Sequence, residues 1–149
     1  MASWQDYLKL MSGLSRTLEQ LTQVEREKNS AAAQGDVHGV EECMKREQVL
    51  SLSLRGCDQK RDKMLAGLGL QGVTLSRLED HCPPDYLLET RRVVEELQRQ
   101  YSLFQAASEV TRNTLEINLR AIERAQAIQA GDAGLAEDRR KNHQTDFRA

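Results

Sequence analysis

Apolar residues recur at intervals of three or four along three long stretches of the chain, as they do on one face of a helix. No stretch alternates apolar and polar residues in the manner of a strand. The three stretches cover residues 3–34, 37–66 and 84–129. We therefore predict an all-α fold, an antiparallel three-helix bundle with coiled-coil-like packing, an extended third helix and a short connecting helix.

Each stretch supplies one apolar stripe to the expected core. The first stripe is Trp4, Tyr7, Met11, Leu14, Leu18 and Leu21, widened by Leu8, Val24 and Ala31. The second is Val40, Cys43, Leu50, Leu54, Cys57, Met64 and Leu68, with Glu47 and Arg61 on the same repeat as expected rim residues. The third is Leu87, Val94, Leu97, Tyr101, Phe104, Leu115, Ile122 and Ala125. Residues 108–114 are poor in apolar groups, so we expect loose packing there.

Local chemistry predicts a tight hairpin between the first two helices. Ser3 can cap the first helix with its hydroxyl. Gly35 suits the left-handed conformation that often follows a helix end. Asp36 can cap the second helix, because its carboxylate accepts the free N–H groups of the first turn. The pair Gly35-Asp36 therefore predicts two antiparallel helices joined by a short turn.

A second break separates the second and third helices. The glycine-rich residues 67–72 end the second helix. Thr74 is expected to cap a short helix over residues 75–81. Pro84 suits the first turn of the third helix, where its missing N–H loses no hydrogen bond.

The third helix is longer than its expected partners. At 1.5 Å per residue the first two helices span about 45 Å and the third about 68 Å. About 15 residues, roughly 115–129, should therefore extend past the hairpin while still carrying apolar side chains. Another copy, a folded-back tail or a client must cover them, because exposed aliphatic groups are costly. The predicted client-binding residues are Leu115, Ile117, Leu119, Ile122 and Ile128.

Glycine and charged residues dominate after Gln129, and the helical periodicity ends. We therefore divide the chain into a helical bundle domain, residues 1–129, and a flexible C-terminal tail, residues 130–149.

Composition argues against several classes of protein. Aromatic residues make up only 4% of the 149 residues, so a core of aliphatic side chains should leave no cofactor pocket. The 21 basic and 23 acidic residues are interspersed, which does not favour nucleic-acid binding. No apolar run is long enough for a membrane span, and the first residues do not resemble a signal peptide. An odd number of cysteines, three, favours reduced thiols and the cytoplasm.

The candidate chemical motifs are better explained as structure. Residues 67–72 match G-x-G-x-x-G, but they follow a predicted helix and not the strand that a dinucleotide site needs. The cysteines and histidines lack the paired spacing of zinc ligands, and Cys43 and Cys57 lie on an apolar stripe. We find no nucleophile with a base beside it and no paired-carboxylate site. We expect no enzyme activity, no cofactor and no metal.

The middle of the chain resembles the FlgN family of flagellar export chaperones. The resemblance is carried by residues 31–42, in which small residues lead into Gly35-Asp36, then Val37, and then an acidic helix start. The continuation Lys45-Arg46-Glu47 and Leu50, the leucines of residues 75–78, and the proline before the last helix also fit. Gly39 departs from the usual helix-forming residue. The resemblance covers about residues 1–129.

The resemblance implies a function that the pattern alone does not. It implies a cytoplasmic type III export chaperone that holds C-terminal segments of the hook–filament junction proteins FlgK and FlgL, bound through its own C-terminal region. The alternative is a structural or adaptor coiled-coil protein that dimerises through its third helix. A permanent dimer would favour the adaptor, and the sequence is compatible with a homodimer.

Overall fold

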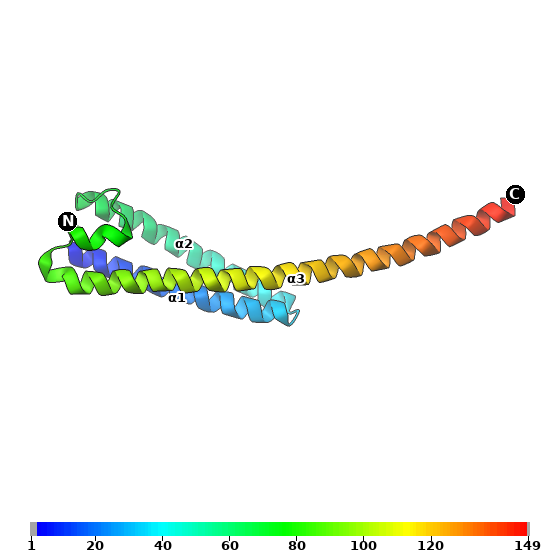
Figure 1. Cartoon of the computed structure of the whole chain (residues 1–149), viewed down its shortest axis with the longest axis horizontal. Helices are drawn as coiled ribbons and strands as arrows, with labels where there is room; N and C mark the ends of the chain where they lie inside the picture. Colours follow the sequence, from blue (N-terminus) through cyan, green and yellow to red (C-terminus); the bar gives the residue numbers. More distant parts are fainter. Residues whose placement is uncertain (1–2, 149) are drawn as a thin grey trace.

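The computed structural model describes the backbone of residues 3–148 and the side chains of residues 3–131. Its elements are α1 (Trp4–Ala33), α2 (Val37–Gly67), the 3-10 turns η1 (Leu75–His81) and η2 (Pro84–Tyr86), and α3 (Leu87–Arg148), shown in Figure 1. The described part of the chain contains no strand. The all-α prediction is confirmed.

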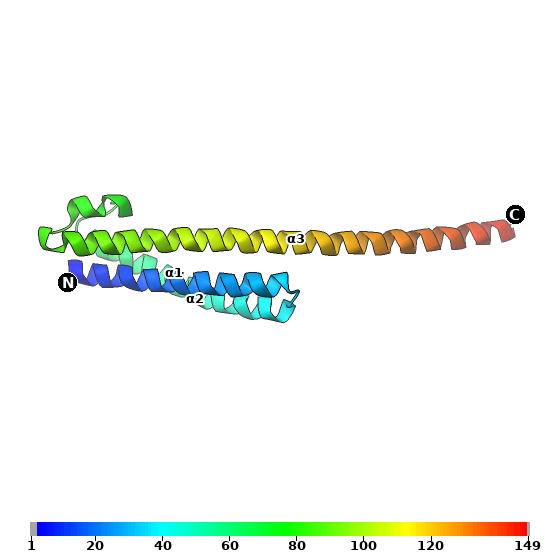
Figure 2. The ribbon, with the colours of Figure 1, turned by 60° about the horizontal axis from the view of Figure 1, so that its bottom comes forward.

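Helix α1 is the central element of the bundle. It packs along α2 on one side and along α3 on another, whereas no described Cα atom of α2 comes within 8 Å of one in α3. Helix α2 runs antiparallel to α1, and α3 runs parallel to α1, as the colours of Figures 1 and 2 show. The buried apolar side chains come mainly from α1 and α3: Trp4, Tyr7, Leu8, Met11, Leu14, Leu18, Leu21, Leu78, Val93, Val94 and Leu97, joined by Leu65 of α2.

The ends of α1 and α2 form as their capping residues predict. The Ser3 hydroxyl accepts a hydrogen bond from the Asp6 amide, and the Asp36 carboxylate accepts one from the Gly39 amide. Gly35 has φ +72°, a conformation that costs glycine little. Its amide donates to the Ala32 carbonyl, which closes the end of α1. The predicted hairpin is confirmed.

Polar groups fix the register of α1 against α3. The Trp4 indole N–H donates to the Thr90 hydroxyl at 2.9 Å, and the Thr111 hydroxyl donates to the Glu25 carbonyl at 3.0 Å. Farther along, two more pairs follow the same pattern, Thr114 to Asn29 and Asn118 to the Ala32 carbonyl. In all four pairs the residue numbers differ by 85 or 86. The loose packing expected over residues 108–114 is wrong at Thr111, which is only 1% exposed.

Helix α2 is less buried than its stripe suggests. Only Cys43 and Leu65 are buried in it, because α1 is the only described helix whose Cα atoms come within 8 Å of those of α2. The other expected core residues are half-buried: Val40, Leu50, Leu54, Cys57, Met64 and Leu68. Sequence periodicity identifies the inward face of a helix but not the number of neighbours that cover it.

The connection between α2 and α3 differs from the prediction in two details. The expected short helix is a 3-10 turn, and the Thr74 side chain makes no capping hydrogen bond. Pro84 begins the separate turn η2, so α3 itself starts at Leu87. Leu78, which is 1% exposed, fixes η1 to the bundle.

Helix α3 extends well beyond the hairpin (Figures 1 and 2). Among the residues with described side chains, Asn118 makes the last hydrogen bond from α3 to α1, so the extension begins about one turn later than expected from helix length. The expected helix end near Gln129 is wrong, because α3 continues to Arg148. The division into a bundle and a flexible tail stays a prediction. We call residues 119–131, which are all exposed, the α3 extension.

Candidate client-binding surface

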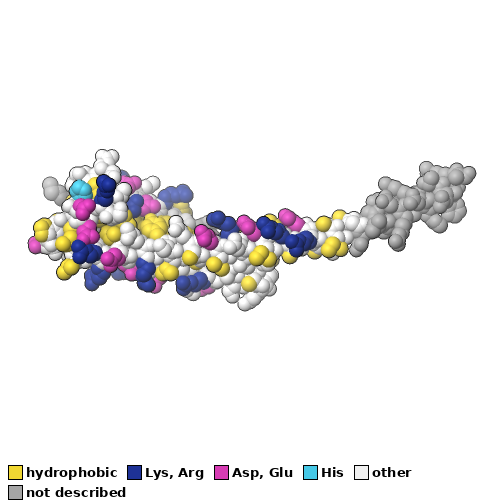
Figure 3. Space-filling view, in the orientation of Figure 1, with side chains coloured by type: hydrophobic (Ala, Val, Ile, Leu, Met, Phe, Trp, Pro, Cys, Tyr) yellow, Lys and Arg dark blue, Asp and Glu magenta, His cyan; other side chains and the backbone are white. Residues whose placement is uncertain are grey.

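An apolar groove lies where the α1–α2 hairpin meets α3. Its volume is about 560 Å³. The hairpin forms one wall and α3 forms the other, with Leu115, Asn118, Leu119, Ala121 and Ile122. We call this space the hairpin groove. Figure 3 shows hydrophobic side chains along the same part of α3, separated by charged ones.

Three of the five predicted client-binding residues line the hairpin groove. Leu115 is half-buried, while Leu119 and Ile122 are 55% and 54% exposed. These three residues follow the three- and four-residue spacing of one helix face.

The other two predicted residues lie outside this groove. Ile117 and Ile128 are 64% and 65% exposed and do not line it. At 100° per residue, both fall about 200° around α3 from Leu115. The structure therefore divides the five predicted residues between two faces of the helix.

The hairpin contributes residues that sequence analysis did not assign to the site. Val37 and Val40 line the groove together with Ala32 and Ala33. Val37 is 68% exposed, although it directly follows the capping residue Asp36. The sequence feature that could have identified Val37 as a groove residue is its apolar side chain at the start of a helix, outside the apolar stripe. Val40, expected in the core, instead forms part of the groove wall.

Next to this groove, a cluster of charged side chains lies between α1 and α2. The Lys28 ammonium is 3.2 Å from a Glu47 carboxylate oxygen and 3.7 Å from one of Glu25. The side chains of Glu25, Lys28 and Glu47 are only 9%, 14% and 19% exposed. Burial, a hydrogen bond with Glu25 and the Glu25 charge raise the pKa of Glu47 to about 7, although Lys28 acts in the opposite direction. Glu47 is therefore more buried than the rim position expected for it.

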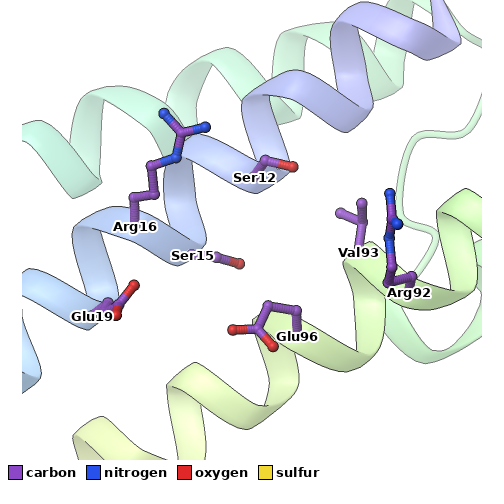
Figure 4. Close-up of a pocket in the computed structure, with 7 residues that line it drawn as sticks. All are labelled: Ser12, Ser15, Arg16, Glu19, Arg92, Val93 and Glu96. Atoms are coloured by element: carbon purple, nitrogen blue, oxygen red, sulfur yellow. The ribbon is translucent and has the colours of Figure 1, made fainter.

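A second hollow, on another part of the α1–α3 contact, has a different character. It measures about 330 Å³ and is lined by Ser12, Ser15, Arg16, Glu19, Arg92, Val93 and Glu96 (Figure 4). No histidine or cysteine lines it, so neither serine has an imidazole or thiolate base beside it. Its polar lining does not match the apolar wall of the hairpin groove.

The residues of the other candidate motifs have structural positions. Gly67 ends α2, and Gly69 and Gly72 adopt φ values of +73° and +82° in the loop that follows. Cys43 is a buried thiol whose pKa is raised by burial, and Cys57 and Cys82 are half-buried. Within the described residues, no cluster of three or more His, Cys, Asp or Glu side chains is placed to hold a metal ion. None of the described helices is long and apolar enough to cross a membrane.

These observations describe a helical bundle with an open apolar groove beside a long helix extension. That architecture defines a class of helical proteins suited to binding another protein segment. The FlgN family profile, described as FlgN protein, matches residues 1–134. The chain belongs to the FlgN family, and as a member of that family it is a flagellar export chaperone. No curated protein and no solved structure matches the chain.

Proposed function

We propose that this chaperone acts in the cytoplasm on the hook–filament junction proteins FlgK and FlgL. It would bind an amphipathic C-terminal segment of the client and keep that segment soluble and export-competent. The family membership supports a flagellar client, and FlgK and FlgL are the clients that the resemblance implies. No catalytic step is part of this function.

The observation that carries the proposal is the exposed apolar wall of the hairpin groove. Leu119 and Ile122 are more than half exposed, yet they stand beside Val37 of the hairpin. A helical client segment laid in this groove would bury all three side chains, and each aliphatic group that becomes fully buried gains about 1.5–3 kcal/mol.

Two isoleucines on opposite faces of α3 provide the test. Ile122→Asp would place a carboxylate in the groove, where a bound client removes its water without supplying a partner. We expect at least a hundredfold loss of affinity for a FlgK C-terminal fragment in titration calorimetry, because such burial costs several kcal/mol. Ile117→Asp is the matched control, since Ile117 is as exposed but lies outside the groove.

Both variants should fold, because neither side chain is part of the core. Leu18→Asp, at a position with 0% exposure, should unfold the bundle, so its melting curve provides the comparison for the two folded surface variants. Equal losses of affinity in Ile122→Asp and Ile117→Asp would contradict a site in the hairpin groove. An unchanged affinity in Ile122→Asp would do so as well.

A second candidate function uses the opposite face of α3. Val110, Ile117 and Ile128 are 53–65% exposed, and the first two are one heptad apart. A parallel or antiparallel pairing of two copies through this face would make the protein a dimeric adaptor. Sedimentation equilibrium tests this candidate: Ile117→Asp should convert a dimer to a monomer, and a wild-type chain that is already monomeric excludes it.

A further inference from the structure

The three long helices leave one side of the bundle open. Asn29 and Lys28 are neighbours in α1, so their side chains diverge by about 100°. Asn29 meets Thr114 of α3, whereas Lys28 meets Glu47 of α2. Both α2 and α3 pack along α1, but no described Cα atom of α2 comes within 8 Å of one in α3. The three helices therefore do not close into a three-helix bundle, and their arrangement is like three corners of a four-helix bundle. We call the unfilled space between α2 and α3 the fourth corner.

Side chains from α2 form one wall of the fourth corner. Met44, Glu47, Ser51 and Arg55 follow three- and four-residue spacing and so lie on one side of α2. Charges on Asp58 and Arg61 influence the pKa of Tyr101, which is raised mainly by burial, so this side of α2 faces α3. A hollow of about 440 Å³ follows this wall and also includes the exposed Leu52.

Side chains from α3 form the opposite wall. A hollow of about 420 Å³ is lined by Ser108, Thr111, Arg112, Leu115, Glu116 and Leu119 of α3, with Glu25 and Lys28 of α1. It shares Leu115 and Leu119 with the hairpin groove. The Lys28–Glu47 ion pair connects it to the hollow along α2. The hairpin groove and the fourth corner therefore share the Leu115 and Leu119 wall of α3, and we call the two together the channel.

The ion pairs at the floor of this channel share one cation. Two carboxylates, Glu25 and Glu47, face a single ammonium group, that of Lys28. When Glu47 is charged, its buried Oε1 atom has no hydrogen-bond donor among the described residues, whereas the protonated carboxyl can form a hydrogen bond with Glu25. A buried acceptor without a partner costs about 1–3 kcal/mol. A helix with an entirely apolar face would cover this oxygen further without satisfying it.

We propose that the fourth corner receives an amphipathic helix of the exported client, and that one lysine or arginine on its inward face donates to Glu47 Oε1. The apolar side chains of the client helix then contact Met44 and Leu52 on α2 and Leu115 and Leu119 on α3. The single cation fixes the register of the client helix, because a shift of one turn leaves both charges unpaired. This inference rests on the proposed function and assigns the chemistry of its binding site.

Proton release should accompany binding. The raised pKa of Glu47 leaves part of this carboxyl protonated near neutral pH, and an arriving cation favours its charged form. Glu25 and Lys28 on α1 are the charged groups that affect the pKa of Glu47. Arg55 on α2 lines the same hollow as Glu47, and Arg112 and Glu116 on α3 line the neighbouring hollow with Glu25 and Lys28. Titrations in buffers of different ionisation enthalpy measure the number of protons released.

A mutant cycle with a FlgK C-terminal fragment tests the contact. The fragment is prepared as the natural sequence and as single Lys→Met or Arg→Met variants, and each is titrated into the wild-type chain and Glu47→Gln. We expect Glu47→Gln to weaken binding of the natural fragment about tenfold or more, as expected for a hydrogen bond between charged groups. For one basic-to-Met variant, Glu47→Gln should cause no further loss. Glu41→Gln removes the same charge from an exposed position of α2 and is the matched control.

The outcomes separate this inference from the proposed function. Binding that is equally strong in Glu47→Gln, or lost equally in Glu41→Gln, overturns the contact with Glu47 but leaves the chaperone function in place. Absence of any binding by the wild-type chain overturns both. If a chain ending at residue 131 binds the fragment more tightly, the C-terminal residues of this chain occupy the channel instead. A dimer that Glu47→Gln dissociates would place a second copy there. Either result overturns the client contact.

Discussion

The carboxyl of Glu47 should make the stability of the bundle depend on pH near neutrality. Burial is the main cause of its raised pKa, followed by the hydrogen bond with Glu25 and the Glu25 charge. Its pKa is about 7 in the folded chain against 4.5 for an ordinary glutamate. Between these two pH values the folded state holds more protons than the unfolded state. The free energy of unfolding therefore contains a contribution that is present below about pH 4.5 and is lost as pH rises to about 7.

The size of this contribution follows from the two pKa values. Their difference corresponds to at most about 3 kcal/mol. The Glu47 side chain remains 19% exposed, so solvent screening should reduce the measured value to about 1–2 kcal/mol. Glu47→Gln removes the titrating group while keeping the shape of the side chain.

Urea unfolding followed by circular dichroism measures this contribution as a difference between variants. From about pH 5 to about pH 8, the free energy of unfolding of Glu47→Gln should rise relative to the wild type by about 1–2 kcal/mol. Glu41→Gln, with its exposed side chain, should show no such trend. A difference between Glu47→Gln and wild type that stays constant with pH, or that changes with the opposite sign, would refute the reasoning.

Three further predictions concern stability. Gly39→Ala should lower the stability by about 1 kcal/mol despite the better helix propensity of alanine, because the new Cβ would lie 2.5 Å from the capping Asp36 carboxylate. Gly56→Ala, with open space around the new Cβ, should instead raise the stability by about the same amount. Thermal melts that rank these two variants in the opposite order would contradict this prediction. Thr90→Val should cost about 1–2 kcal/mol in urea unfolding, because the buried Trp4 indole N–H loses its acceptor, and an unchanged midpoint would show that this hydrogen bond contributes nothing. A chain ending at Gln129 should melt within a few degrees of the full chain, since Asn118 makes the last hydrogen bond to α1; a larger decrease would show that the removed residues dock.

The parts of the fold that depend on neighbouring residues were predictable from the sequence. The hairpin requires only a residue suited to positive φ, Gly35, followed by a capping carboxylate, Asp36. The inward face of α1 was equally clear, because Met11, Leu14 and Leu18 are fully buried, as their spacing predicts. These features arise within one or two helical turns.

The parts that depend on contacts between distant segments were not predictable in the same way. Thr90 and Thr111 are ordinary surface residues by type, yet both are buried because they bond to α1. Periodicity also could not indicate that the backbone of α2 approaches α1 closely but not α3, which leaves Val40 and Glu47 beside open hollows. The predicted site illustrates the same limit, because proximity in sequence grouped Ile117 with Ile122 although they point to different sides of α3.

The constant offset of 85 or 86 residues between bonded partners in α1 and α3 has a consequence for how this chaperone can vary. These four hydrogen bonds hold α1 and α3 in a fixed alignment. Insertions in the connection between α2 and α3 would change the offset in residue numbers but not the alignment of α1 with α3. The reach of α3 past the hairpin is instead set by the length of α1. Adding one turn to α1, with a matching turn in α2, would cover Leu119 and Ile122 with the chain's own hairpin. Shortening both by a turn would uncover Leu115 and Asn118. The length of the α1–α2 hairpin therefore determines how much of α3 remains uncovered and available to another protein.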